Sequence, residues 1–217
     1  VPEGTTIWEA AQGQGTLIPH LCHKPEPGYR SDGNCRACMV EIEGERVLAA
    51  SCIRPVQDGM VVHTDTARAE KSRALVVELL AADQPDTAHD ASSHFTEMAA
   101  LNGVSESRFP ARDACHVPLL DDSHVAMNVN LDACIQCGLC VRACREVQVN
   151  DVIGMAGRGH DAYPTFDFAD PMGESTCVAC GECVQACPTG ALMPASVLDD
   201  QQVGDSKDFD EEVKSIC

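Results

Sequence analysis

The sequence predicts an α+β fold in which two small, cysteine-centred units are joined by a helical segment. Three features of the 217-residue chain point to this fold: only 4% of its residues are aromatic, fourteen are cysteine, and one cysteine-rich run occurs twice. So few aromatic side chains can fill only a small core. We therefore expect the cysteines to hold the short segments of each unit together.

The spacing of the cysteines distinguishes a disulfide framework from a set of metal sites. Ten of the fourteen lie in runs with two or three residues between neighbours. Thiols this close converge on one ion or cluster and cannot easily pair across a fold. Metal sites in a reducing compartment are therefore predicted.

Charge and hydropathy exclude several classes of partner. The formal net charge of −19 would repel phosphate, so we expect no nucleic acid. No apolar run reaches the roughly 20 residues of a membrane span, and no signal segment opens the chain. We predict a cytoplasmic protein with no membrane partner, whose acidic surface either docks basic patches on other proteins or simply keeps it soluble.

Residues 1–65 are predicted to form a small unit of one helix and three strands. A helix over residues 6–11 stops at Gly13 and Gly15, and a loop rich in Pro and Gly follows. The expected strands, of which the first two form a hairpin, are residues 39–42, 46–49 and 60–63. Residues 1–4 resemble the end of a strand, so we expect the chain to be truncated at its start.

Residues 66–125 are predicted to be a helical linker. A helix over residues 66–82 has an apolar stripe at helical spacing and basic residues on its other faces. The stripe consists of Leu75, Val76, Leu79 and Leu80, and the basic residues are Arg68, Lys71 and Arg73. A second, short helix is expected over residues 95–101.

Residues 126–195 contain the repeat. The run CIQCGLCVRAC at residues 134–144 returns at residues 177–187 as CVACGECVQAC, with seven of eleven positions identical. Between the copies, residues 152–155 and 165–168 suggest an inserted hairpin. Residues 196–217 are predicted to be an acidic, extended linker.

Each copy of the repeat has the spacing C-x2-C-x2-C-x3-C. In bacterial proteins with this pattern, three thiolates from one copy and the fourth from the other bind a 4Fe-4S cluster. By that rule the two ligand sets are Cys134, Cys137, Cys140 with Cys187, and Cys177, Cys180, Cys183 with Cys144. Gly138 and Gly181 occupy the same place in each loop, where the backbone must pass close to inorganic sulfide. The alternative, a pair of zinc sites, leaves no use for four cysteines in each run.

A third set of cysteines has the spacing C-x12-C-x2-C-x13-C and comprises Cys22, Cys35, Cys38 and Cys52. Two ligands from a loop and one from each flank can hold a planar 2Fe-2S cluster. Gly33 and Ala37 are small enough to let backbone amides approach the sulfurs. A zinc site is the alternative here.

Two cysteines are left outside these sets. We interpret Cys115 as a buried thiol, with metal ligation beside His116 as the alternative. Cys217 is interpreted as the first ligand of a further 4Fe-4S cluster beyond the end of the chain.

The histidines are not predicted to bind metal. His20 and His23 flank Cys22 and are expected to face solvent or to support the cluster, whereas His89 and His94 are expected to be ordinary surface residues. No nucleophile paired with a base, no phosphate-binding Gly-rich loop and no carboxylate pair with a pocket is apparent. We therefore predict no catalytic residues and a role in electron conduction.

The order of these sites resembles the N-terminal region of three families. They are the alpha subunit of soluble NAD-dependent formate dehydrogenase, the small diaphorase subunit of NAD-reducing hydrogenase, and the iron–sulfur subunit of respiratory NADH:quinone oxidoreductase. Residues 131–154, 19–23 and 33–42 are most similar to formate dehydrogenase alpha subunits. The resemblance covers essentially the whole chain. It implies a β-grasp 2Fe-2S ferredoxin-like domain at residues 1–65 and, after the helical linker, a bacterial 2x(4Fe-4S) ferredoxin-like domain at residues 126–195.

The same resemblance implies an electron-transfer arm that carries electrons from formate oxidation to a partner that reduces NAD. Lys214 to Cys217 matches the start of a 4Fe-4S motif that leads into a catalytic domain with a molybdenum or tungsten bis-pterin guanine dinucleotide. The implied partners are that missing catalytic domain, a beta subunit that binds FMN and NAD, and a small 2Fe-2S gamma subunit. A hetero-oligomer is therefore expected.

One departure from the family lies in the linker. The family commonly has a 4Fe-4S site there with ligands H-x3-C-x2-C-x5-C, but residues 82–100 contain no cysteine. We expect that cluster to be absent and electron conduction to be unaffected. Two rival interpretations remain: a complete diaphorase subunit, which predicts a gene that ends soon after Cys217, and a zinc-binding scaffold, which predicts a colourless protein.

Overall fold

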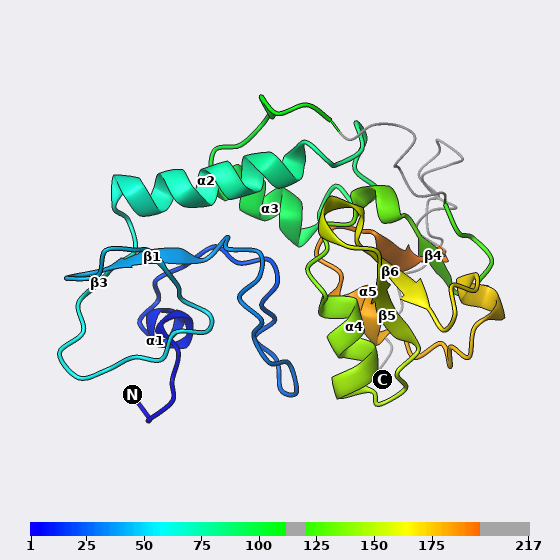
Figure 1. Ribbon diagram of the computed structural model, residues 1–217, viewed down its shortest axis with the longest axis horizontal. Helices are drawn as coiled ribbons and strands as arrows, with labels where there is room; N and C mark the ends of the chain where they lie inside the picture. Colours follow the sequence, from blue (N-terminus) through cyan, green and yellow to red (C-terminus); the bar gives the residue numbers. More distant parts are fainter. Residues whose placement is uncertain (112–119, 196–217) are drawn as a thin grey trace, which may run out of the picture.

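Two groups of short elements lie side by side in the computed structural model, which describes residues 1–111 and 120–195 (Figure 1). The first group contains helix α1 and a three-stranded sheet, and the second contains helices α4 and α5 with two small sheets. Helix α2, Ala67–Ala81, runs along the first group toward the second, and α3, His94–Leu101, packs beneath it. None of the helices in these residues is long and apolar enough to cross a membrane.

Helix α1, Ile7–Gly13, begins with a reciprocal cap. The Thr6 hydroxyl accepts a hydrogen bond from the Glu9 amide at 3.2 Å, and the Glu9 carboxylate accepts one from the Thr6 amide at 2.7 Å. This pairing satisfies two donors that a helix start leaves free. Trp8 is buried against the sheet, and its indole nitrogen donates to the Ile18 carbonyl at 3.0 Å. The first group is therefore built on the predicted helix, with the chain's only tryptophan in its core.

The predicted strands of this group form, but they are shorter than expected. Strand β1, Met39–Ile42, lies between β2, Ala49–Ala50, and β3, Val62–His63, and both neighbours are antiparallel to it. The expected strand at residues 46–49 begins only at Ala49, because Val47 is 57% exposed and lies outside the sheet. Residues 1–4 form no strand, so the expectation of a strand end there was wrong.

Helix α2 has the predicted length, but it buries a different face. Its buried residues are Ala69, Arg73 and Val77, while Leu79, in the predicted stripe, is 55% exposed. The Arg73 guanidinium donates to the carbonyls of Met39 at 2.9 Å and of Thr64 at 2.7 Å. Because these carbonyls lie at the ends of β1 and β3, a cation occupies the buried face of α2, which was predicted to be one of its polar faces.

In the second group, the two copies of the repeat supply helices α4, Leu139–Arg142, and α5, Glu182–Ala186, which pack against each other. Strands β5, Ile153–Ala156, and β6, Tyr163–Phe166, form the expected hairpin. The second strand lies two residues earlier than predicted, and Phe168 is 98% exposed.

A sheet that the sequence did not predict joins the two ends of the second group. Strand β4, Met127–Val129, pairs with β7, Leu192–Pro194, in antiparallel register. The residues of β4 are buried, and the surrounding core consists of aliphatic side chains, cysteines and methionines with one phenylalanine, Phe166. The fold is thus a mixture of short helices and strands packed around thiols, as so few aromatic residues require.

Candidate metal centres

The first predicted set comes together beside the three-stranded sheet. Cys22 and Cys35 come from the loop that precedes β1, whereas Cys38 and Cys52 directly flank β1 and β2. The Cys22 thiol hydrogen-bonds with the thiols of Cys35 and Cys52, and Cys38 hydrogen-bonds with Cys52. All four sulfurs therefore lie within one cluster of contacts, and all but Cys35 are buried.

These contacts distribute the protons of the four thiols unequally. Hydrogen bonds from Cys35 and Cys52 stabilise a thiolate at Cys22 and lower its pKa well below the ordinary value. A hydrogen bond from Cys52 lowers the pKa of Cys38 to about 6. The pKa values of Cys35 and Cys52 are raised in turn, chiefly because each thiol donates to the sulfur of Cys22. Since iron binds the thiolate form, two of the four ligands are prepared for it.

Backbone amides also point at this set. The Ala37 amide lies 3.5 Å from the Cys35 sulfur, the Cys35 amide 3.5 Å from the Cys22 sulfur, and the Cys22 amide 3.4 Å from the Cys35 sulfur. Arg36 has a left-handed backbone, with φ of 60°, which turns the loop around the sulfur. Donors aimed at sulfur stabilise negative charge there.

Gly33 is required for a different reason from the one expected. Its φ is +62°, and a Cβ atom at this position would lie 2.7 Å from Cδ1 of Ile53. The absence of a side chain at Gly33 lets the cysteine loop pack directly on the residue after Cys52.

The two copies of the repeat form the same cradle. Gln136 and Ala179, at matching positions, both have φ of 57°, and their amides lie 3.4 Å from the sulfurs of Cys134 and Cys177, respectively. Gly138 and Gly181 are also left-handed, with φ of 72° and 75°, and each starts its helix. The duplication therefore extends from the sequence to individual backbone angles.

The fourth cysteine of each copy lies with the other copy. Burial raises the pKa of Cys137, and the charge of Cys187 adds to that effect. Burial also raises the pKa of Cys140, followed by the charges of Cys137 and Cys134 and then by those of Cys187 and Cys183. Burial raises the pKa of Cys183 to about 12, and the charges of Cys177, Cys180 and Cys144 add to that effect. Because charges act in this way only at short range, Cys187 lies near Cys137 and Cys144 lies near Cys183. The two crossed ligand sets remain a prediction from the spacing.

The described cysteines are free thiols, so no disulfide competes for them. Each set offers four sulfur ligands, and amides point at sulfurs in all three. All-sulfur donor sets with amide hydrogen bonds are the usual environment of iron–sulfur clusters. The donor chemistry of the three sets is therefore the kind that iron–sulfur clusters require.

The histidines make more contacts with the rest of the protein than the sequence predicted. His20 and His23 both pack edge-on against Trp8, with ring centroids 4.8 and 4.5 Å away, and burial lowers the pKa of His20 to about 4. The Nε2 atom of His94 lies 2.8 Å from the His20 carbonyl, which accepts a hydrogen bond from it. His89 contacts Asp132 at 2.8 Å. The expectation that His89 and His94 are ordinary surface residues was wrong, because both connect the linker to a cysteine-bearing segment.

Three further predictions concern residues outside the described ranges. They are the buried thiol of Cys115, the additional ligand Cys217 and the extended linker over residues 196–217. They remain predictions from the sequence.

Comparison with known protein families agrees with this arrangement of sites. Residues 1–67 match a 2Fe-2S iron–sulfur cluster binding domain, and residues 133–191 match a 4Fe-4S dicluster domain. The first match contains all four cysteines of the first set, and the second contains both copies of the repeat.

Individual relatives are subunits of larger redox enzymes. The NADP-reducing hydrogenase subunit HndD of Solidesulfovibrio fructosivorans is 35% identical over 200 residues, which are 89% of this chain and 34% of that protein. The mitochondrial 78 kDa subunit of NADH-ubiquinone oxidoreductase from Candida albicans is 32% identical over 167 residues, 74% of this chain and 23% of the relative. The chain thus spans about a third or less of the length of these relatives.

A solved structure is similar over most of its length. One chain in the crystal structure of NAD+-reducing [NiFe]-hydrogenase in the H2-reduced state superposes with a TM-score of 0.80 at 30% sequence identity, covering 90% of this chain and 82% of that one. The protein therefore belongs to the family of iron–sulfur subunits found in NADH-quinone oxidoreductases and in NAD+-reducing hydrogenase.

Proposed function

We propose that this chain is the electron-transfer arm of the alpha subunit of a soluble, cytoplasmic, NAD-dependent formate dehydrogenase. Electron transfer by iron–sulfur domains is the role shared with its relatives, and formate as the electron source is the finer part of the proposal. The observation that carries the electron-transfer role is the match of residues 1–67 and 133–191 to 2Fe-2S and 4Fe-4S dicluster binding domains, whose cysteines lie near one another in the structure.

The proposed ligands are the residues of the three cysteine sets. They are Cys22, Cys35, Cys38 and Cys52 for one 2Fe-2S cluster; Cys134, Cys137, Cys140 and Cys187 for one 4Fe-4S cluster; and Cys177, Cys180, Cys183 and Cys144 for the other. Clusters of this kind, when bound, accept and release one electron at a time.

The chain's own residues prepare these sites in three ways. They hold the sulfurs in place, as the left-handed residues Gln136 and Ala179 do at matching positions. They donate amide hydrogen bonds to the sulfurs, which stabilise negative charge. They also exclude water, since Cys137 and Cys140 are both buried. An arm of this kind needs no acid, base or nucleophile of its own.

The case for formate rests on sequence. Residues 131–154, 19–23 and 33–42 resemble formate dehydrogenase alpha subunits. Formate oxidation to carbon dioxide releases two electrons and one proton, and reduction of NAD+ to NADH consumes two electrons and one proton. In the proposed hetero-oligomer, a molybdenum or tungsten pterin in the rest of the alpha subunit serves the first reaction. A flavin-containing beta subunit, with a small 2Fe-2S gamma subunit beside it, serves the second.

A second candidate function is the diaphorase arm of a hydrogenase. It is favoured by the similarity to HndD and to the chain from NAD+-reducing hydrogenase. The cysteine sets of this chain serve either enzyme equally well, because they conduct electrons without contacting the substrate.

The test is the electron source that the native complex uses. The complex is purified under nitrogen and supplied with NAD+ and either formate or hydrogen. We expect NADH to form with formate and not with hydrogen. In the Cys137→Ser variant, we expect no NADH to form with formate. NADH formation with hydrogen alone would establish the hydrogenase arm instead. Tightly bound zinc in a colourless complex would contradict both.

A further inference from the structure

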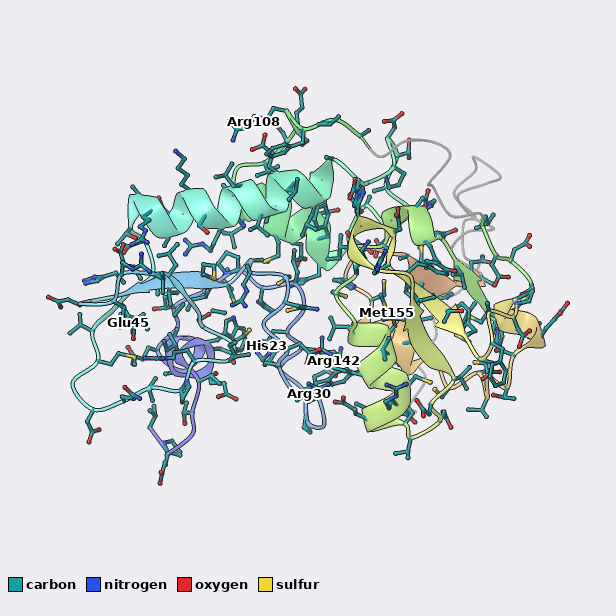
Figure 2. The ribbon with its side chains drawn as sticks, viewed as in Figure 1. His23, Arg30, Glu45, Arg108, Arg142 and Met155 are labelled. Carbon is teal, nitrogen blue, oxygen red and sulfur yellow. The ribbon has the colours of Figure 1, made fainter. Side chains whose placement is uncertain are left out.

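One buried cation lies at the junction of the two groups of elements. Figure 2 shows Arg142 with Arg30 and His23 near the middle of the molecule, where the long loop of the first group meets helix α4 of the second. The Arg142 side chain is 2% exposed. A fully buried guanidinium is costly unless its donors are used, so its contacts indicate what it is for.

The contacts of Arg142 join two different cysteine sets. Its Nη2 atom donates to the carbonyl of Cys22 at 2.7 Å and to the carbonyl of Cys137 at 3.2 Å. Cys22 is a proposed 2Fe-2S ligand, and Cys137 is a proposed ligand of the first 4Fe-4S cluster. The two thiols are themselves close enough for the charge of Cys22 to raise the pKa of Cys137, after the larger effects of burial and Cys187. Arg142 therefore lies between two neighbouring sites.

The carboxylates near Arg142 lie on the solvent side of its buried guanidinium. Its Nε atom lies 3.1 Å from a carboxylate oxygen of Asp32, which is 24% exposed and also pairs with Arg30 at 2.5 Å. Arg30 pairs in turn with Glu146 at 2.8 Å, so two arginines and two carboxylates balance in number, but both carboxylates are partly exposed whereas the Arg142 guanidinium is buried beside the cysteine carbonyls. The other Nη atom of Arg142 donates to the backbone carbonyl of Arg30, a neutral acceptor.

The repeat supplies a comparison for this residue. Gln185 occupies the position of Arg142 in the second copy, and its side chain is exposed. The cradle of that copy forms without a buried guanidinium at this place, although the Lys24 ammonium donates to the Gln185 carbonyl at 3.4 Å, so the fold of a cluster loop does not require an arginine there. Arginine occurs at this position only in the first copy of the repeat, where it contacts the Cys22 loop.

Resting on the proposed function, we propose that Arg142 is a positioning residue that holds the Cys22 and Cys137 loops together and raises the reduction potentials of the two clusters they carry. A reduced cluster carries one more negative charge than an oxidised one, and a nearby buried cation stabilises that charge. A planar guanidinium with several fixed donors can bind two carbonyls at once, which the point charge of lysine cannot do.

The experiment compares variants of the full-length protein by redox titration, with each cluster followed by its electron paramagnetic resonance signal. Arg142→Gln copies the second half of the repeat. We expect it to lower the midpoint potentials of the 2Fe-2S cluster and the nearer 4Fe-4S cluster by about tenfold in each one-electron equilibrium, or about 59 mV. The other 4Fe-4S cluster, bound by the second copy of the repeat, has a loop that Arg142 does not contact, and we expect its potential to stay unchanged. Arg142→Lys, which retains the charge, restores most of both potentials.

A matched control and a variant of opposite sign complete the test. Arg145→Gln removes an exposed cation that pairs with Asp151 in the turn after α4, and it should leave all potentials unchanged. Asp32→Asn removes the partial counter-charge and should raise the same two potentials, which keeps the test open if Arg142→Gln does not fold. Unchanged potentials in Arg142→Gln or in Asp32→Asn, or equal shifts of all three clusters, would overturn the role of Arg142. Absence of cluster signals from the unaltered protein would instead overturn the proposed function.

Discussion

The two copies of the repeat have the same backbone and different surroundings. Both loops contain a left-handed residue that donates to the first sulfur, followed by a left-handed glycine that starts a helix. In the first copy, however, Cys137 and Cys140 are buried, whereas Cys180 of the second copy is exposed. Cysteine spacing therefore sets the shape of each cradle, and the segments packed around it set its polarity.

The difference arises from the neighbour of each copy. The first copy faces the long loop of the N-terminal group, which covers it and accepts hydrogen bonds from Arg142 through the Cys22 carbonyl. The second copy has lighter contacts with that loop, such as the hydrogen bond from Tyr29 to Glu182 at 2.7 Å. A duplicated sequence can thus provide two sites with different electron affinities.

The largest expected effect comes from replacing each crossed cysteine, one at a time, with serine. If each fourth cysteine serves the other copy, Cys144→Ser removes the cluster bound by the second copy of the repeat. Cys187→Ser likewise removes the cluster bound by the first copy, and each loss is about four iron atoms. Iron analysis with electron paramagnetic resonance of the reduced protein distinguishes the two losses. Cys115→Ser, at a residue assigned to no set, is the control. If Cys144→Ser abolished the cluster of its own copy instead, the crossed assignment would be wrong.

Exposure should next separate the two 4Fe-4S sites in their resistance to iron removal. Because Cys180 is exposed and Cys137 and Cys140 are buried, a strong iron chelator should remove the cluster bound by the second copy several times faster than the cluster bound by the first copy. The decay of each cluster's signal with time measures the two rates in one sample. Equal rates would show that burial in the first copy does not protect it.

A smaller and symmetrical effect is expected at the matching glycines. Gly138 and Gly181 have open space where a Cβ would lie, so alanine introduces only backbone strain, of about 1 kcal/mol at each site. That cost should lower the melting temperature of the cluster-loaded protein by about 2–4 °C in both variants. Gly13→Ala is the control, since Gly13 has an ordinary backbone and equally open space. A large difference between the two variants would contradict the equivalence of the cradles.

The smallest effect should come from the contact between the loop and the second copy. Tyr29→Phe removes the hydrogen bond to Glu182, which is partly exposed to solvent, so we expect a loss of up to about 1 kcal/mol. Burial, with this hydrogen bond, also holds the pKa of Tyr29 above its usual range. Tyr163→Phe, at a side chain that is 39% exposed, serves as the control in thermal unfolding. A loss of stability as large as that of Arg142→Gln would mean that both copies depend equally on the N-terminal group.

Local sequence patterns correctly predicted those elements that are determined by residues close together in the chain. The helix after Thr6, the length of α2 and the repeat all depend on residues a few positions apart, and all three are present in the structure. The C-x2-C-x2-C-x3-C spacing also predicts the crossed sets of cysteines, which stay a prediction.

Contacts between distant segments were not predictable in the same way. Strands β4 and β7 are three residues each and lie at opposite ends of the second group, so no periodicity marks them. The burial of Arg73 depends on carbonyls at the ends of two strands that only the folded chain brings together. For Arg142 one signal did exist, since it is a point at which the two copies differ, Arg in one and Gln in the other.

The iron and acid-labile sulfide content of the purified protein, combined with electron paramagnetic resonance of its reduced form, tests the central claim most directly. The account predicts one 2Fe-2S signal and two 4Fe-4S signals from these residues, with about ten iron and ten sulfide per chain from the three sets. A protein that contains zinc in place of iron, or no acid-labile sulfide, would contradict it.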